Sequence, residues 1–419
     1  MNKVIIFFLS LLFLHPITLR AQWLTLDQAY QMAKENYPLI KQRELIRKSG
    51  QYSMENIAKG ALPQFSIAGQ ATYQSEVTEI PIKLPNQDLP QISKDQYRIY
   101  GELVQPLTDL ITVKHQKEIQ EATMQYATDD LETELYKVRD RVNALYFAIL
   151  LLEEQRRQNA LTKQDIQNGI NKVNAAIQHG TDFRSSADKL KAESLKIDQR
   201  DIELTASRTA YLEMLGLFIG QALSETTELQ PPQPVPVLIA IDRPELRAFS
   251  SQQKVYDAQA RLLHTKTLPR FSLFLQGGAG RPALNMLNNN FRFYYLGGLR
   301  LNWTLNNYYT HKREKDLLDL NREMIAVQKE TFLFNTNLQL HQEASEIKKI
   351  QELLITDQKI LALRTSVKTA ASAQLENGVI TVNDYLSEVL NEENARQQAI
   401  LHHLQLLQAQ YILKTTSGN

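Results

Sequence analysis

The two halves of the sequence repeat one pattern, and this repeat restricts the fold more than any other feature of the chain. Four anchor positions recur at matching spacings: Pro38 and Pro63 against Pro244 and Pro269, 25 residues apart, and Pro106 and Gly180 against Thr304 and Gly378, 74 residues apart. The offset between the halves changes from 206 to 198 residues, so eight additional residues lie in the first half, near 80–85. Such a repeat indicates one structural unit used twice. We assign residues 22–229 to the first repeat, 242–419 to the second, and the Pro-rich segment 230–241 to an extended linker.

Each repeat contains two segments whose side chains alternate between apolar and polar, which is the period of a β-strand. In one of them, Tyr97, Ile99 and Leu103 fall on one face, and Arg98 and Glu102 fall on the other. The alternation predicts strands at about 64–79 and 95–105 in the first repeat and at about 270–279 and 290–303 in the second. A helical segment precedes each pair of strands, and a proline ends it.

Residues that break helices are rare after the strands, since the whole chain has only 15 glycines and 14 prolines. Residues 109–178 contain no proline and one glycine, Gly169, and residues 309–377 contain neither. We predict long helices at about 109–178 and 309–377, turns at Gly180 and Gly378, and returning helices at about 185–215 and 382–414. A helix of roughly 67 residues is about 100 Å long, too long for a compact globule. The predicted fold is mainly α, with two structural repeats of helix, strand, strand, long helix and helix.

The N-terminus has the features that direct a protein out of the cytoplasm. A short basic start precedes an apolar run at 4–14, and a polar stretch ends at Ala21. We interpret residues 1–21 as a secretory signal peptide cleaved after Ala21, the alternative being a short membrane anchor or a buried helix. No later stretch reaches the roughly 18 apolar residues of a transmembrane helix. If the exported chain enters a membrane, we expect it to do so as strands.

The composition excludes several classes of function. The chain has no cysteine, which excludes disulfides, thiolate metal sites and a cysteine nucleophile. Its formal charge of +1 gives no sign of a nucleic-acid partner. No sequence motif of a zinc protease, a serine hydrolase or a phosphate-binding loop occurs, and the 8 histidines are scattered. We therefore predict no catalytic site, no metal site and no cofactor.

Strands with one apolar and one polar face suit a wall between lipid and water. A sheet in hydrocarbon must close on itself, because every backbone polar group there must be paired. Four strands cannot close, two chains would give a barrel filled by its own side chains, and three chains would give 12 strands around water. We expect a homotrimer whose 12-stranded barrel is continued by a long α-helical tunnel. A soluble antiparallel sheet packed on helices is the alternative.

Short motifs along the chain occur in the order found in a known family. They are LTLDQA at 24–29 with NYP at 36–38, LP at 62–63, QPL at 105–107, LGL at 215–217 and ENGVITVNDYL at 376–386. In these segments the mature chain resembles the TolC-like outer membrane efflux proteins. The resemblance implies an outer-membrane barrel with its helical part in the periplasm. It also implies docking to a periplasmic adaptor (membrane fusion) protein and to an inner-membrane pump, in efflux or type I secretion.

The two helical turns are the candidate functional site. Gly180 and Gly378, with Val379 and Thr381, would form the periplasmic tip that docks the adaptor. The resemblance places Asp384 in a ring of carboxylates that constricts the tunnel. The second aspartate of the family's constriction is replaced here by a serine, at 387.

Two aspartates near the first turn, Asp182 and Asp188, are weaker gate candidates. Any one of the three aspartates could instead cap a helix or interact with its dipole. The aromatic side chains Trp303, Tyr308 and Tyr309 follow the last strand, where we expect a membrane interface. Packing against helices is the alternative role for them.

The predicted function is an outer-membrane exit duct. A periplasmic coiled-coil adaptor or a structural envelope protein without a pore is the alternative. The sequence leaves open the cargo and the type of inner-membrane pump, because a solvated tunnel has no diagnostic pocket.

Overall fold

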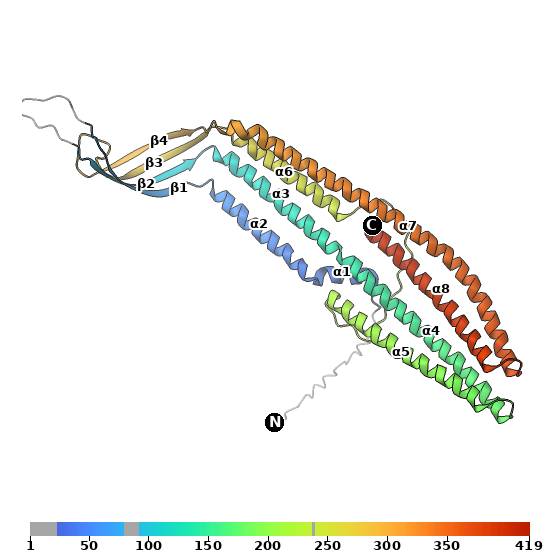
Figure 1. Ribbon diagram of the computed structural model, residues 1–419. Helices are drawn as coiled ribbons and strands as arrows, with labels where there is room; N and C mark the ends of the chain where they lie inside the picture. Colours follow the sequence, from blue (N-terminus) through green and yellow to red (C-terminus); the bar gives the residue numbers. More distant parts are fainter. Residues whose placement is uncertain (1–22, 79–91, 237–238) are drawn as a thin grey trace, which may run out of the picture. The chain divides into compact units, whose positions relative to one another are not determined.

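The computed structural model describes residues 23–78, 92–236 and 239–419. The predicted signal peptide and the inserted residues near 80–85 lie outside this part of the chain. The first repeat contains α1 (Leu26–Asn36), the 3-10 helix η1 (Pro38–Lys41), α2 (Gln42–Lys59), β1 (Gln64–Tyr73), β2 (Asp95–Pro106), α3 (Asp109–Tyr136), α4 (Val138–Gln178) and α5 (Arg184–Ile219). The second contains α6 (Pro244–Thr265), β3 (Arg270–Arg281), β4 (Arg292–Asn302), α7 (Asn307–Glu376) and α8 (Val382–Ser417) (Figure 1). The chain is mainly helical, and helices precede and follow the strands in both repeats.

One predicted helix is interrupted. The sequence predicts a continuous helix over about 109–178, whereas the structure separates α3 from α4 at Lys137. Lys137 has φ −61° and ψ −19°, which lie in the right-handed helical region, with ψ closer to the 3-10 value than to the α-helical one. The backbone therefore tightens for one residue without a proline or a glycine, and the sequence carries no marker of the break. The equivalent helix of the second repeat, α7, is uninterrupted over 70 residues.

Other element ends also differ from the prediction. The strand expected at about 64–79 ends at Tyr73, and one further backbone hydrogen bond follows it in the described residues, from the Gln74 N–H to Lys94 O at 2.8 Å. β3 continues to Arg281, and β4 ends before Trp303. The helices expected to end near 215 and 414 continue as α5 and α8 until a left-handed glycine ends each, at 220 and 418.

The described residues form two compact units, each built from both repeats. One unit comprises residues 23–38, 135–236, 239–241 and 337–419, and it is wholly helical apart from its linkers. The other comprises residues 39–78, 92–134 and 242–336, and it contains the sheet. Within the described residues, no helix is long and apolar enough to cross a membrane.

The core of the helical unit is built around Tyr146 on α4, whose side chain is fully buried. Leucines and isoleucines of α1, α4 and α5 surround it. The single proton of the Tyr146 hydroxyl is shared between the carbonyl oxygens of Leu24, at 2.6 Å, and Gln230, at 2.7 Å. These bonds fasten the start of the first repeat and the start of the linker to the N-terminal part of α4.

A second core lies nearer the two helical turns, where α4 and α5 pack with α7 and α8. Gly169 on α4 lies beneath the ring of Tyr385 on α8. A Cβ atom at position 169 would lie 2.8 Å from Tyr385 Cε1, closer than van der Waals contact allows. The one glycine of the long helix is therefore required by the close approach of a buried aromatic ring.

The sheet is antiparallel, with the strand order β1-β2-β3-β4 (Figure 1). Its register aligns alternate residues of all four strands on the same face. One face carries mainly apolar side chains: Phe65, Ile67, Tyr73, Tyr97, Ile99, Leu103, Phe271, Leu273, Leu275, Phe293, Tyr295, Leu299 and Leu301. The opposite face carries mainly glutamine, serine, threonine, glutamate and arginine side chains, together with two tyrosines and the apolar residues Val104, Phe274 and Leu296. The division of Tyr97, Ile99 and Leu103 from Arg98 and Glu102 agrees with the sequence pattern.

Candidate functional site

The two predicted turns have the same backbone structure. Gly180 has φ +70° and Gly378 has φ +68°, in the left-handed region that glycine adopts at least cost. After α4, the N–H of Thr181 bonds Ala176 O at 2.9 Å, and after α7 the N–H of Val379 bonds Gln374 O at 2.8 Å. Both are Schellman motifs, which satisfy the last carbonyls of a helix. A Cβ at either glycine would meet no atom within 4 Å, so the backbone angle and not the space requires glycine.

Asp384 forms a capping box at the start of α8. The Asp384 N–H donates to Thr381 Oγ1 at 3.3 Å, and Asp384 Oδ2 accepts from the Thr381 backbone N–H at 3.0 Å and from its hydroxyl at 2.7 Å. The hydrogen bond from the Thr381 side chain, followed by that from its backbone, holds the pKa of the Asp384 carboxyl below its ordinary value. The Asp384 residue is exposed, so its carboxylate remains accessible to solvent while it caps the helix.

The other two aspartates have local partners. Asp182 precedes α5, and its Oδ1 accepts from the Ser186 hydroxyl at 2.7 Å and from the Phe183 N–H at 2.6 Å. Asp188 lies one turn further along α5, 3.7 Å from Lys191 Nζ. In the single chain Asp182 therefore organises the start of α5, and Asp188 forms an exposed ion pair.

Lysine side chains link the two helical hairpins close to the turns. Lys172 on α4 contacts Glu376 at the end of α7, with 2.9 Å between Nζ and Oε2, and donates to the Ser372 hydroxyl at 3.0 Å. Lys189 on α5 donates to Asn383 Oδ1 on α8 at 3.2 Å. These exposed contacts are individually weak, but they join both pairs of neighbouring helix ends.

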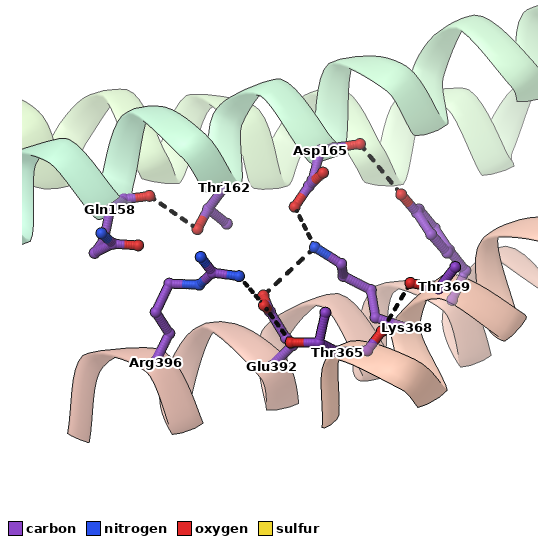
Figure 2. A network of polar contacts seen from close by, with 9 residues as sticks. Gln158, Thr162, Asp165, Thr365, Lys368, Thr369, Glu392 and Arg396 are labelled. Atoms are coloured by element: carbon purple, nitrogen blue, oxygen red, sulfur yellow. Dashed lines mark hydrogen bonds and ion pairs between the residues drawn. The ribbon is translucent and has the colours of Figure 1, made fainter. Parts of the chain in front are cut away.

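A charged network deeper in the bundle was not predicted from the sequence (Figure 2). Lys368 on α7 contacts Asp165 on α4 at 2.8 Å and Glu392 on α8 at 3.5 Å. Glu392 also accepts from the Thr365 hydroxyl at 3.1 Å and pairs with Arg396. Only the spacing of four residues between Glu392 and Arg396 was visible in the sequence as a helical pair. The network connects three helices at a single point.

The side chain of Glu392 is only 5% exposed. Burial raises its pKa, but the hydrogen bond from Arg396 and the charge of Lys368 outweigh burial and hold the pKa below its ordinary value. A buried carboxylate between two cations is compensated, so removing either side of the network leaves a costly unpaired charge.

The aromatic residues after β4 have mixed surroundings. Trp303 Nε1 and the Tyr308 hydroxyl both donate to Thr267 O, at 3.0 Å and 3.2 Å. Each of these side chains is about half exposed, whereas Tyr309 is 82% exposed. Trp303 and Tyr308 therefore brace the chain segment between α6 and β3 while presenting one side to the surroundings, and Tyr309 has no comparable packing.

Across the described ranges, 23–78, 92–236 and 239–419, no group of three or more histidine, aspartate or glutamate side chains is arranged to hold a metal ion.

Neither a protein-family model nor a curated protein sequence matches this chain. Solved structures are similar to it. The outer membrane protein VceC of Vibrio cholerae is 11% identical, with a TM-score of 0.66 over 94% of this chain and 96% of that one. The open state of the MtrE outer membrane channel of Neisseria gonorrhoeae is 15% identical, with a TM-score of 0.65 over 94% and 89%. The CmeC outer membrane channel of Campylobacter jejuni is 13% identical, with a TM-score of 0.62 over 94% and 85%.

These similarities cover nearly the full length of both chains in each comparison. At such low sequence identity they establish the fold: the chain has the fold of the TolC-like outer membrane channels.

Proposed function

We propose that this protein is an outer-membrane exit duct, a non-enzymatic channel that passes cargo from a periplasmic adaptor and an inner-membrane pump to the exterior. The observation that carries the proposal is the exposed apolar face of the four-stranded sheet, in a chain with the fold of outer membrane channels. Phe293 and Tyr295 on this face are 92% and 80% exposed. A soluble protein rarely exposes so large an apolar patch, whereas a lipid-facing wall requires one.

The edges of the sheet support a trimer. β1 and β4 each pair with one strand in the described part of the chain. Open edges are not tolerated in hydrocarbon, so β4 of one copy would pair with β1 of the next. Three copies give 12 strands, the smallest such assembly that encloses water. In this arrangement the polar face lines the lumen, and the helices extend into the periplasm.

The alternative of an adaptor or a structural protein without a pore explains less. Such a protein would have no use for a sheet with one lipid-compatible face and one polar face. The turns at Gly180 and Gly378 also place a helical hairpin in each repeat, as a symmetrical tube requires.

We place the gate at these turns. Asp384 is exposed at the start of α8, and threefold symmetry would bring three such carboxylates together at the inner mouth. Asp182 and Asp188 are secondary members of this region. The tip residues Gly180, Gly378, Val379 and Thr381 are accessible for an adaptor, since all four are exposed.

The contacts of Lys172 and Lys368 support a constricted resting state of the tunnel. They hold α7 and α8 against α4, so outward movement of either hairpin must break them. Trp303, Tyr308 and Tyr309 would lie at the periplasmic boundary of the membrane, where aromatic side chains are favoured.

Conductance tests this proposal. The purified protein is added to planar lipid bilayers and the current is recorded at fixed voltages. We expect discrete, long-lived conductance steps of a water-filled pore. If circular dichroism shows that the protein is folded and it never conducts, the channel proposal is contradicted.

A further inference from the structure

The polar face of the sheet carries more positive than negative side chains. Its charged residues, identified by the register, are Arg98, Glu102, Arg270, Arg292 and Arg300. Two of the arginines have acidic neighbours. Arg300 pairs with Glu102 at 2.7 Å, and Arg270 lies 3.9 Å from Asp109. Among the described residues, Arg98 and Arg292 form no ion pair with a carboxylate.

Arg98 and Arg292 lie at one level of the sheet. Arg98 on β2 is opposite Gly280 on β3, and Gly280 is opposite Arg292 on β4. Gln70 on β1 completes the level without a charge. Neighbouring strands are about 4.8 Å apart, so the two arginine backbones are separated by about 10 Å with no side chain between them. A Cβ at position 280 would lie 3.0 Å from Tyr97 O, so glycine is favoured there and the space stays open.

This level is near the strand ends that are remote from the helices. The helices adjoin Gln64, Pro106, Arg270 and Asn302, at the opposite ends of the four strands. The next level towards the helices carries Tyr100 and Tyr294. The Arg98 guanidinium lies 5.9 Å from the centre of the Tyr294 ring. The arginine level therefore adjoins an aromatic surface on its inner side.

We propose that this level is an anion-selective ring near the outer mouth and that the duct favours organic carboxylates. The inference rests on the proposed trimer, in which three copies bring six guanidinium groups to one level of the lumen. Like charges in a narrow pore with a low-dielectric wall focus a potential that concentrates ions of opposite sign. Guanidinium groups bind carboxylates through paired hydrogen bonds, and the tyrosines offer faces for apolar parts of the cargo.

The test compares two double substitutions in the same pore. One changes the net charge of the lumen, and the other leaves it unchanged. One variant is Arg98→Gln with Arg292→Gln, which removes the ring. The matched variant is Glu102→Gln with Arg300→Gln, which removes a neutral ion pair from the same face. Reversal potentials are measured in bilayers under a tenfold KCl gradient. Block of the current is then measured with citrate added to both chambers.

We expect loss of the ring to lower the permeability of chloride relative to potassium by roughly threefold or more and to raise the citrate concentration for half block by about tenfold. The matched variant should behave as the wild type. If the reversal potential and the citrate block change equally in both variants, or change in neither, the selective ring is contradicted while the channel proposal stands. If the wild-type protein never conducts, the channel proposal fails and the ring fails with it.

Discussion

Leu299→Arg is the substitution that most sharply separates a lipid-facing from a soluble sheet. Leu299 lies on the apolar face of β4, opposite Leu273 of β3, and its side chain is 61% exposed. β4 extends over 11 residues, Arg292–Asn302, so Leu299 is two residues from the middle of the strand. Phe293 lies on the same face but four residues from the middle, near the outer end.

The depth of each residue sets the expected cost. A strand that rises about 3.4 Å per residue at a tilt of about 45° gains about 2.4 Å of depth per residue. Leu299 would lie about 5 Å from the midplane and Phe293 about 10 Å from it. An arginine costs about 2–4 kcal/mol near the midplane and about 0–1 kcal/mol near the interface. Over three copies, Leu299→Arg should cost about 6–12 kcal/mol and Phe293→Arg at most about 3 kcal/mol.

The assay is the amount of trimer extracted by mild detergent from outer-membrane fractions and resolved by native electrophoresis. Leu299→Arg should abolish most of the trimer, and Phe293→Arg should reduce it modestly. Arg300→Gln, on the opposite face of the same strand, should assemble like the wild type. A full yield of trimer from Leu299→Arg, or an equal loss from Arg300→Gln, would refute the assignment of the two faces.

Three further substitutions test the helical unit. Asp384→Ala should enlarge the resting conductance and raise the permeability of chloride relative to potassium in planar bilayers, because it removes the carboxylates that oppose anions at the inner mouth, whereas Asp27→Ala in α1 should change neither. Gly169→Leu should lower the free energy of unfolding by about 3 kcal/mol, measured by urea denaturation, because a side chain there overlaps a buried ring. Asn168→Leu, at the exposed neighbouring position, should have little effect. Equal losses of stability in the two variants would contradict the packing. The pKa of Glu392 is lowered in the folded state, so its contribution to stability is present above its ordinary pKa and is lost as the pH falls through the lowered value. The acid-induced loss of stability should therefore be smaller in Glu392→Gln, and identical pH profiles of the two proteins would refute this.

The sheet could be predicted from sequence because its pattern is local. Alternation with a period of two residues places Arg98 and Leu103 on opposite faces whatever surrounds them. The turns could also be predicted from the sequence, since a glycine after a long run without helix breakers is typical of a left-handed C-cap. The length of β1 was overestimated, because the alternation already ends at Tyr73, where the three polar residues Gln74, Ser75 and Glu76 follow one another.

The remaining features depend on contacts between residues far apart in the sequence. The break at Lys137 follows no proline or glycine, and it is visible only in the backbone angles. The network of Asp165, Lys368 and Glu392 joins three helices, and no spacing along the chain brings these residues together. The capping role of Asp384 was one of the two alternatives left by the sequence, and the hydrogen bonds to Thr381 establish it.

The central claim is that three copies of this chain close a pore in the outer membrane. The most direct measurement is the location and mass of the native protein. Its location is determined by separating the envelope fractions, and the molar mass of the detergent-extracted protein is determined by sedimentation equilibrium. The account predicts that the protein is found with the outer membrane, requires detergent for release and has the mass of three chains. Recovery from the periplasm as a soluble monomer without detergent would contradict it.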